Sequence, residues 1–209
     1  MIKTIASSFI LLLFTCTDSE PIDVVETTPV EEVEQVELEK TPEPDSDEES
    51  FLLFYKNFTE TIHSKNLDSL NTYIDVDFGV YFIESNGAIP SFTKYYGFDK
   101  FKSVQGKVFG ELKFKLLDLE PVFEDLPKVV CTETKYDKDG CFVEKINPFK
   151  DNEIWYYTEL NEKEKQAISI IAKSIVYTVV NTSNYTFYFS ETNEGLKLSF
   201  IDLRVPCEA

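Results

Sequence analysis

Apolar side chains recur at helical spacing near the middle of the first half of the chain. Taken at about 100° per residue, five of them fall in one narrow stripe, which predicts a helix with a single buried face: Phe51, Phe54, Tyr55, Phe58 and Ile62. Ser50 is the expected N-cap, because its hydroxyl can accept a hydrogen bond from a backbone N–H of the first turn. A second, shorter helix is expected over residues 67–74.

The second half of the chain predicts one helix followed by three strands. Asn161 and Glu164 have the spacing of a capping box, which predicts a helix over residues 162–173. Three β-branched or alternating runs, separated by turn residues, then predict an antiparallel meander: 175–180, 185–190 and 196–203.

Weaker signals lie between these two regions. A strand is expected over 79–84 before an Asn86-Gly87 turn, a helical turn or two over 98–104, and a strand or extended segment over 112–119. The order of elements predicts one α+β domain over residues 51–209, with helices packed on a curved, mainly antiparallel sheet.

The first 15 residues are typical of a secretory signal peptide. Lys3 supplies a positive start, and an uncharged, mainly apolar run of about ten residues follows, over 5–14. A membrane-spanning helix needs about 20 residues, so this run is too short to be one. We therefore expect residues 1–15 to be removed on export.

The end of this run, Leu13-Phe14-Thr15-Cys16, resembles the lipobox of bacterial lipoproteins, in particular those of the Bacteroidetes type. The resemblance implies that Cys16 is acylated, so that membrane lipid is a partner, and that the protein is anchored to the outer membrane, at its surface or its periplasmic face. Two or three acyl chains give stable anchoring. A conventional signal peptide with an incidental cysteine is the alternative.

Composition changes sharply after Cys16. Residues 17–50 hold 14 acidic side chains against one basic residue, Lys40, with four prolines and no aromatic residue. Charge repulsion and low hydrophobicity keep such a segment extended. Residues 16–50 are therefore expected to form the lipidated cysteine and a disordered acidic linker to the domain.

The net charge of the whole chain is -18, and its only arginine is Arg204. This composition excludes nucleic acid as a partner, because phosphate binding needs clustered lysine and arginine. Residues 51–209 carry 24 acidic and 18 basic side chains, a net charge of -6, so the acidity belongs mainly to the linker.

The start of the domain, from Phe54 and Tyr55 through Phe58 and Ile62 to residues 66–74, resembles the nuclear-transport-factor-2-like (SnoaL-like) superfamily. The resemblance covers about 30 residues and implies a long helix, a short helix and a curved sheet that form a cone with a pocket. The helix expected over 162–173, between strands, departs from that family's order. The end of the chain, Phe200 to Cys207, resembles that of small uncharacterised lipoproteins, which implies no activity.

Three cysteines remain after Cys16, and export would place them where disulfides persist. Cys131 and Cys141 flank an Asp-Gly turn signal, so a hairpin would bring them together, and a Cys131–Cys141 disulfide is the favoured pairing. Cys207 would then be a free thiol. A bridge from Cys207 to either of the other two is the alternative.

Residues able to carry chemistry are few. His63 is the only histidine, and it falls outside the buried stripe of its helix, so a surface position is expected. The segment 137–140 with Glu144 lacks two of the ligand positions of a calcium loop, which favours a plain turn. One histidine and scattered cysteines do not make a transition-metal site. We assign no catalytic, metal-binding or cofactor-binding residue.

These patterns predict a non-enzymatic envelope lipoprotein whose domain binds an unknown envelope protein or a small ligand, without a cofactor. The alternative is a small pocket enzyme, a hydrolase or isomerase of the SnoaL-like type. That alternative needs at least two of four carboxyl groups to meet His63 in an apolar cavity: Asp75, Asp77, Glu84 and Asp202. The aromatic side chains are expected mainly in the core.

Overall fold

The computed structural model describes residues 46–114, 117, 119–183 and 185–207. The signal peptide, Cys16 and most of the linker lie outside these residues. The described part contains three α-helices, α1 (Ser46–Ser64), α2 (Leu67–Asn71) and α3 (Glu162–Lys173). It also contains seven strands: β1 (Val80–Asn86), β2 (Ile89–Tyr95), β3 (Val122–Phe123), β4 (Cys141–Glu144), β5 (Ile175–Asn181), β6 (Thr186–Thr192) and β7 (Gly195–Asp202).

The seven strands form one open sheet in the order β2-β1-β7-β6-β5-β4-β3. Neighbouring strands run antiparallel except for β1 beside β7 and β3 beside β4, which are parallel. The predicted α+β class and the closing meander β5–β6–β7 are therefore confirmed. The meander returns the end of the chain to the middle of the sheet, next to β1.

Helix α1 buries the predicted stripe against the sheet. Phe51, Tyr55, Phe58 and Ile62 are buried, and Phe54 is partly buried at the edge of the same cluster. The helix already includes residues 46–50, so the predicted boundary between linker and domain lies inside it. Ser50 is not its N-cap, as the Ser50 hydroxyl donates to the Ser46 carbonyl oxygen within the helix.

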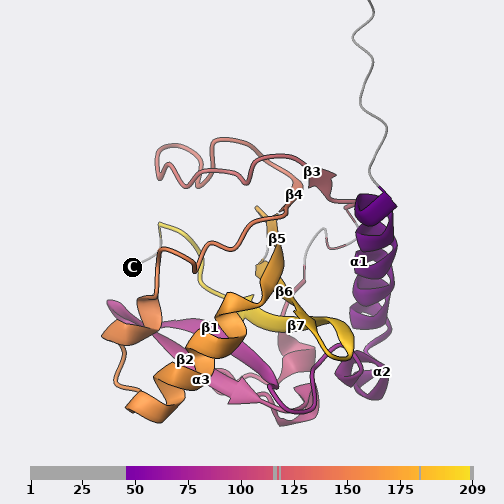
Figure 1. Ribbon diagram of the computed structural model, residues 1–209. Coiled ribbons are helices and arrows are strands. Elements are labelled where there is room, and N and C mark those ends of the chain that lie inside the picture. Colours follow the sequence, from indigo (N-terminus) through magenta and orange to yellow (C-terminus); the bar gives the residue numbers. More distant parts are fainter. Residues whose placement is uncertain (1–45, 115–116, 118, 184, 208–209) are drawn as a thin grey trace, which may run out of the picture. The chain divides into compact units, whose positions relative to one another are not determined.

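Helix α3 packs on the opposite side of the sheet from α1 (Figure 1). Its predicted bounds are confirmed, and so is its capping box: Asn161 Oδ1 accepts from the Glu164 N–H, and Glu164 Oε2 accepts from the Asn161 N–H. These bonds satisfy two backbone donors that a helix N-terminus otherwise leaves unpaired.

The side chains of the strands point alternately to the two faces of the sheet. We call the face toward α1, with Phe82, Phe187 and Phe189, the α1 face, and the other, with Tyr188 and Phe200, the α3 face. Successive strand residues point to opposite faces, which is why Phe187-Tyr188-Phe189 contributes to both.

Two weaker predictions are met only in their lesser form. Of the segment 98–104, Phe98–Lys100 is helical, as one short 3-10 turn. The segment 112–119 contains no strand among its described residues, and Leu112 has an extended backbone. No helix in the described part of the chain is long and apolar enough to cross a membrane.

Candidate functional site

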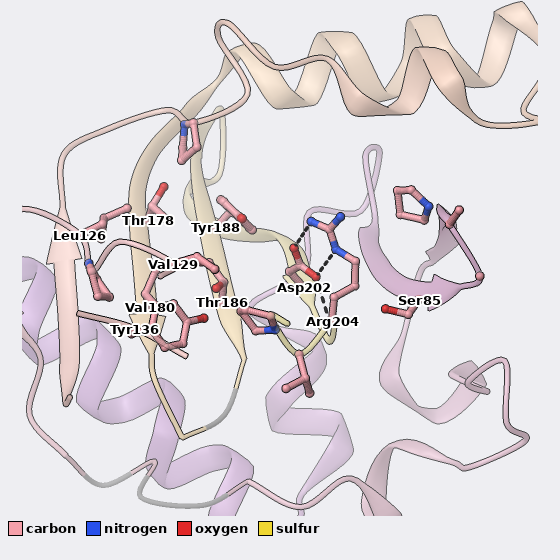
Figure 2. Close-up of a pocket in the computed structure, with 17 residues that line it drawn as sticks. Ser85, Leu126, Val129, Tyr136, Thr178, Val180, Thr186, Tyr188, Asp202 and Arg204 are labelled. Carbon is pink, nitrogen blue, oxygen red and sulfur yellow. Dashed lines mark hydrogen bonds and ion pairs between the residues drawn. The ribbon is translucent and has the colours of Figure 1, made fainter. Parts of the chain in front are cut away.

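A cavity of about 520 Å³ lies on the α3 face of the sheet (Figure 2). Ligand pockets in proteins typically measure about 300–1,000 Å³, so its size suits a small molecule. Three neighbouring strands supply the floor, with Thr178 from β5, Tyr188 from β6 and Asp202 from the end of β7.

Asp202 and Arg204 form an ion pair at this floor (Figure 2). The Arg204 Nε donates to Asp202 Oδ1 at 2.8 Å, and the Arg204 Nη2 donates to Asp202 Oδ2. The Arg204 backbone N–H also donates to Asp202 Oδ1, at 3.0 Å. Asp202 is only 7% exposed, and such bidentate pairs are strong and geometrically specific. The two charges therefore neutralise one another and hold the guanidinium in place.

Two tyrosines line the same cavity beside the ion pair. Tyr188 is 7% exposed and packs against Phe149 and Phe200, and Tyr136 is half-buried. Burial, followed by the negative charge of Asp202, raises the pKa of each tyrosine above its usual range. Both groups therefore remain protonated and can donate a hydrogen bond at neutral pH.

The hydroxyl groups of Tyr188 and Tyr136 make no hydrogen bond to any described residue. Neither hydroxyl is among the buried polar atoms that lack a partner, so both are accessible from the cavity. The cavity therefore presents two donors that a bound molecule could satisfy.

Three segments form the walls. One is the turn between β1 and β2, where Gly87 adopts a φ of 78° that a side chain would disfavour, as the Asn86-Gly87 signal predicts. Another is the loop that carries Leu126, Val129 and Tyr136, opposite Ser85 of β1 (Figure 2). The third is the end of the chain, where Val205 and Pro206 line the cavity.

A disulfide between Cys131 and Cys207 joins the loop wall to the C-terminal wall. The favoured pairing of Cys131 with Cys141 is therefore wrong, as is the free thiol at Cys207, and the alternative through Cys207 is correct. The reason lies in an earlier turn: Val129 and Tyr136 pair with each other, which closes the hairpin before Cys141 is reached. Cys131 lies in that turn, with a φ of 49°.

Cys141 instead begins β4, pairs with Asn181 of β5 and is buried on the α1 face as a free thiol. Its Sγ lies 3.9 Å from the Tyr55 hydroxyl of α1. Burial raises the pKa of this thiol to about 11. Since the thiolate is the nucleophile, Cys141 is placed and protonated as a structural residue.

The four carboxyl groups considered for an enzyme site do not meet His63. Asp202 lines the cavity, whereas His63 is exposed on α1 and lines a groove of that helix. Glu84 accepts from the Val104 N–H, at 3.1 and 3.2 Å from its two oxygens. Asp75 accepts from the N–H groups of Asp77 and Phe78, at 2.9 and 3.0 Å, and the Asp77 side chain is exposed.

The segment 137–140 forms a bend rather than a ligand loop. Asp137 Oδ1 accepts from the Lys128 N–H, and Glu144 Oε2 accepts from the Leu126 N–H, so both carboxylates fix the loop wall of the cavity. Among the residues that the structure describes, no three histidine, cysteine, aspartate or glutamate side chains are grouped so as to hold a metal ion.

Sequence reasoning missed most of the cavity. It singled out Asp202 as one of four carboxyls, but neither Tyr136, Tyr188 nor Arg204 as site residues. One signal was present: Asp202 and Arg204 are two residues apart at the end of a strand, a spacing that places side chains on one face. Comparison with protein-family models, with curated proteins and with solved structures gives no match.

Proposed function

We propose that this protein is a lipid-anchored protein of the cell envelope whose domain binds a small ligand in the cavity on the α3 face. Acylated Cys16 is the anchor to the outer membrane, and the acidic segment after it separates the lipid from the domain. The lipobox-like Leu13-Phe14-Thr15-Cys16 supports the anchor.

The observation that carries the binding proposal is the Tyr188 hydroxyl. It belongs to a 7% exposed residue, lines a cavity of ligand size and has no hydrogen-bond partner among the described residues. A ligand that accepts a hydrogen bond there would pair a donor that faces the cavity and that no described residue uses. The fixed Asp202–Arg204 pair adds further polar groups without a net charge.

Binding fits these groups better than catalysis. A general base works best with a pKa near the operating pH, whereas the pKa of both tyrosines is raised by burial and by Asp202. The Asp202 carboxylate already accepts three hydrogen bonds from Arg204. A pocket enzyme is therefore not the function that we propose.

We also propose that the domain is a variant of the nuclear-transport-factor-2-like cone. The long α1, the short α2 and the sheet that follows support it. In that superfamily the helices and the sheet enclose the pocket. Here aromatic rings fill that space, with Phe58 in edge-to-face contact with Phe187 and Phe189 at 5.5 Å, so the ligand would bind on the opposite face.

Metabolic labelling with a clickable fatty acid tests the anchor. Wild-type protein should take up the label and fractionate with the envelope, whereas Cys16→Ala should carry no label. Cys131→Ser is the matched control, since it also removes one thiol but lies in the domain. Equal label in Cys16→Ala would disprove the anchor.

A thermal-shift screen tests the binding site. Full-length protein is mixed with sugars, amino acids, short peptides, fatty acids and nucleosides, because a ligand that binds only the folded state raises Tm. Ala88→Trp should abolish the shift, as it adds bulk at an exposed position that lines the cavity. Asn193→Trp, in the exposed turn between β6 and β7, should retain it. A shift that survives in Ala88→Trp would place binding elsewhere.

A further inference from the structure

We infer that the cavity takes a neutral, hydroxyl-rich ligand of the saccharide class, an inference that rests on the proposed binding function. The polar groups lie together at the floor around Asp202, Arg204 and Tyr188, whereas the walls are largely apolar (Figure 2). A pyranose ring has the same division, with hydroxyl groups around its edge and C–H groups on its faces.

The hydrogen-bonding groups that line the cavity include both donors and acceptors. Arg204 has five N–H donors on its guanidinium, of which Asp202 takes two in the described contacts. Tyr136 and Tyr188 each add an O–H donor that can also accept. Asp202 Oδ1 accepts two bonds and Oδ2 accepts one, which leaves one lone-pair site on the carboxylate. A ligand that fits these groups must accept several hydrogen bonds and donate at least one, as adjacent sugar hydroxyls do.

Charge favours a neutral ligand over an anion. The positive charge of Arg204 is already compensated by Asp202, and residues 51–209 carry a net charge of -6. An anion would be repelled by Asp202 and by the domain as a whole. A cation would compete with Arg204 for a single carboxylate. A neutral ligand is neither repelled by Asp202 nor in competition with Arg204.

The walls supply a surface for the C–H face of a sugar ring. Pro90, Pro127 and Pro206 line the cavity together with Val129 and Val205. These side chains are rigid or short, so little side-chain entropy is lost when a ligand packs on them. The disulfide from Cys131 to Cys207 holds two of these walls in fixed positions, which lowers the cost of ordering the site.

Calorimetric titration of full-length protein tests the ligand class. The detergent must carry no sugar headgroup, because an alkyl maltoside would occupy the proposed site. The titrants are glucose, galactose, mannose, N-acetylglucosamine and their β-linked disaccharides, with glucuronate, galacturonate and tri-alanine for comparison. We expect at least one neutral sugar to bind, more tightly than either uronate and than tri-alanine.

Two tyrosine variants separate a specific site from a general effect. Tyr188→Phe removes only the hydroxyl that lacks a described partner, and it should weaken the neutral sugar about 3- to 10-fold, the loss expected for one hydrogen bond. Tyr185→Phe is the matched control, as Tyr185 packs on the α1 face, and its affinity should be unchanged.

The results of these titrations separate the saccharide inference from the binding proposal on which it rests. If tri-alanine or a uronate binds and Ala88→Trp abolishes that binding, the cavity is a ligand site but the saccharide class is wrong. If no compound of any class binds or raises Tm, both proposals fail. An equal affinity of Tyr188→Phe and wild type for the sugar would also overturn the inference.

Discussion

The two faces of the sheet are covered in different ways, and the cavity around Asp202 and Arg204 lies on only one of them. On the α1 face a 19-residue helix presents a continuous apolar stripe, and aromatic rings from helix and strands interdigitate. On the α3 face the helix packs over Ile175, Tyr188 and Phe200. Next to α3, loops and the end of the chain cover the sheet.

This difference shows what a helix provides that a loop does not. A helix repeats its apolar side chains every three or four residues, so it can fill the space above a sheet without gaps. Loops carry backbone polar groups and irregular side chains, so they leave space and bring polar atoms to it. The disulfide and the Asp202–Arg204 pair then stabilise the loop-covered part, where continuous packing is lacking.

The largest loss of stability is expected from a substitution that leaves a cavity in the core of the α1 face. Phe58 is 0% exposed, and its ring lies within 6.0 Å of the rings of Tyr55, Tyr73, Phe187 and Phe189. Phe58→Ala should lower the free energy of unfolding by about 4 kcal/mol, through lost burial and a new cavity. Urea denaturation measures this loss.

Leu53→Ala is the control on the same helix. Leu53 is 61% exposed, so its truncation should change stability by less than about 0.5 kcal/mol. Equal losses for Phe58→Ala and Leu53→Ala would mean that α1 does not pack on the sheet as described.

The second-largest loss of stability is expected when the disulfide beside the cavity on the α3 face is reduced. Cys131 and Cys207 are 76 residues apart, and cross-links that close long loops restrict the unfolded chain strongly. Reduction of the wild-type protein should therefore lower the free energy of unfolding by about 3 kcal/mol. It should also weaken ligand binding, because two walls of the cavity lose their link.

A double variant, Cys131→Ser with Cys207→Ser, is the control for reduction. Its urea midpoint should be low from the start and should not respond to reductant, since Cys141 has no described disulfide partner. A non-reducing peptide map gives an independent check. Recovery of a Cys131–Cys141 peptide from native protein would contradict the structure.

A smaller change in stability, which depends on pH and has opposite signs for the two groups, is expected from two buried carboxyl groups near β1. For Asp75, burial raises the pKa, but hydrogen bonds from the Phe78 and Asp77 N–H groups, together with the Thr192 side chain and the positive charge of Lys197, more than offset it, and the pKa lies below its usual range. For Glu84, burial also raises the pKa, and one hydrogen bond from Val104 does not offset it. The charged form of Asp75 therefore has more stabilising partners than that of Glu84, and the two pKa shifts have opposite signs.

The two carboxyls should have opposite effects on stability as the pH changes. The charged form of Asp75 stabilises the fold at neutral pH, and this contribution is lost as pH falls from about 4 through the lower folded pKa. Glu84 destabilises the fold as pH rises from about 4 through its higher folded pKa. Asp75→Asn should therefore cost about 1 kcal/mol near neutral pH and nothing in acid.

Urea unfolding from about pH 3 to about pH 7 measures both effects. Glu84→Gln should be more stable than wild type near neutral pH, and this advantage should vanish in acid. If Asp75→Asn and Glu84→Gln differ from wild type by amounts that do not change with pH, the assigned pKa directions are wrong.

The sequence predicted those parts of the fold that depend on short-range patterns. The capping box of Asn161 and Glu164, the stripe of α1 and the meander of β5 to β7 each rest on residues a few positions apart. The pairing of Cys131 could not be predicted in this way. A ten-residue loop to Cys141 costs less entropy to close than a long one. The pairing is decided instead by the Val129–Tyr136 turn and by the return of β7 beside β1.

The cavity was beyond prediction for the same reason. Tyr136, Tyr188 and Arg204 lie far apart in the chain, and only the sheet order brings β6, the end of β7 and the loop wall together. In the sequence Tyr188 is one aromatic residue among many in a strand. Its role depends on what covers it, and loops have no periodic pattern that shows which residues they will cover.

The smallest effect is expected from removing a tyrosine hydroxyl, and it compares the two faces most directly. On the α1 face the Tyr55 hydroxyl contacts Cys141 Sγ at 3.9 Å, so Tyr55→Phe removes a weak bond inside a packed core and should cost about 0.5–1 kcal/mol. On the α3 face the Tyr188 hydroxyl has no described partner, so Tyr188→Phe should change the free energy of unfolding by less than about 0.5 kcal/mol. Urea denaturation without ligand measures both. A loss in Tyr188→Phe larger than in Tyr55→Phe would show that the Tyr188 hydroxyl is satisfied within the protein, and it would remove the reason to expect a ligand there.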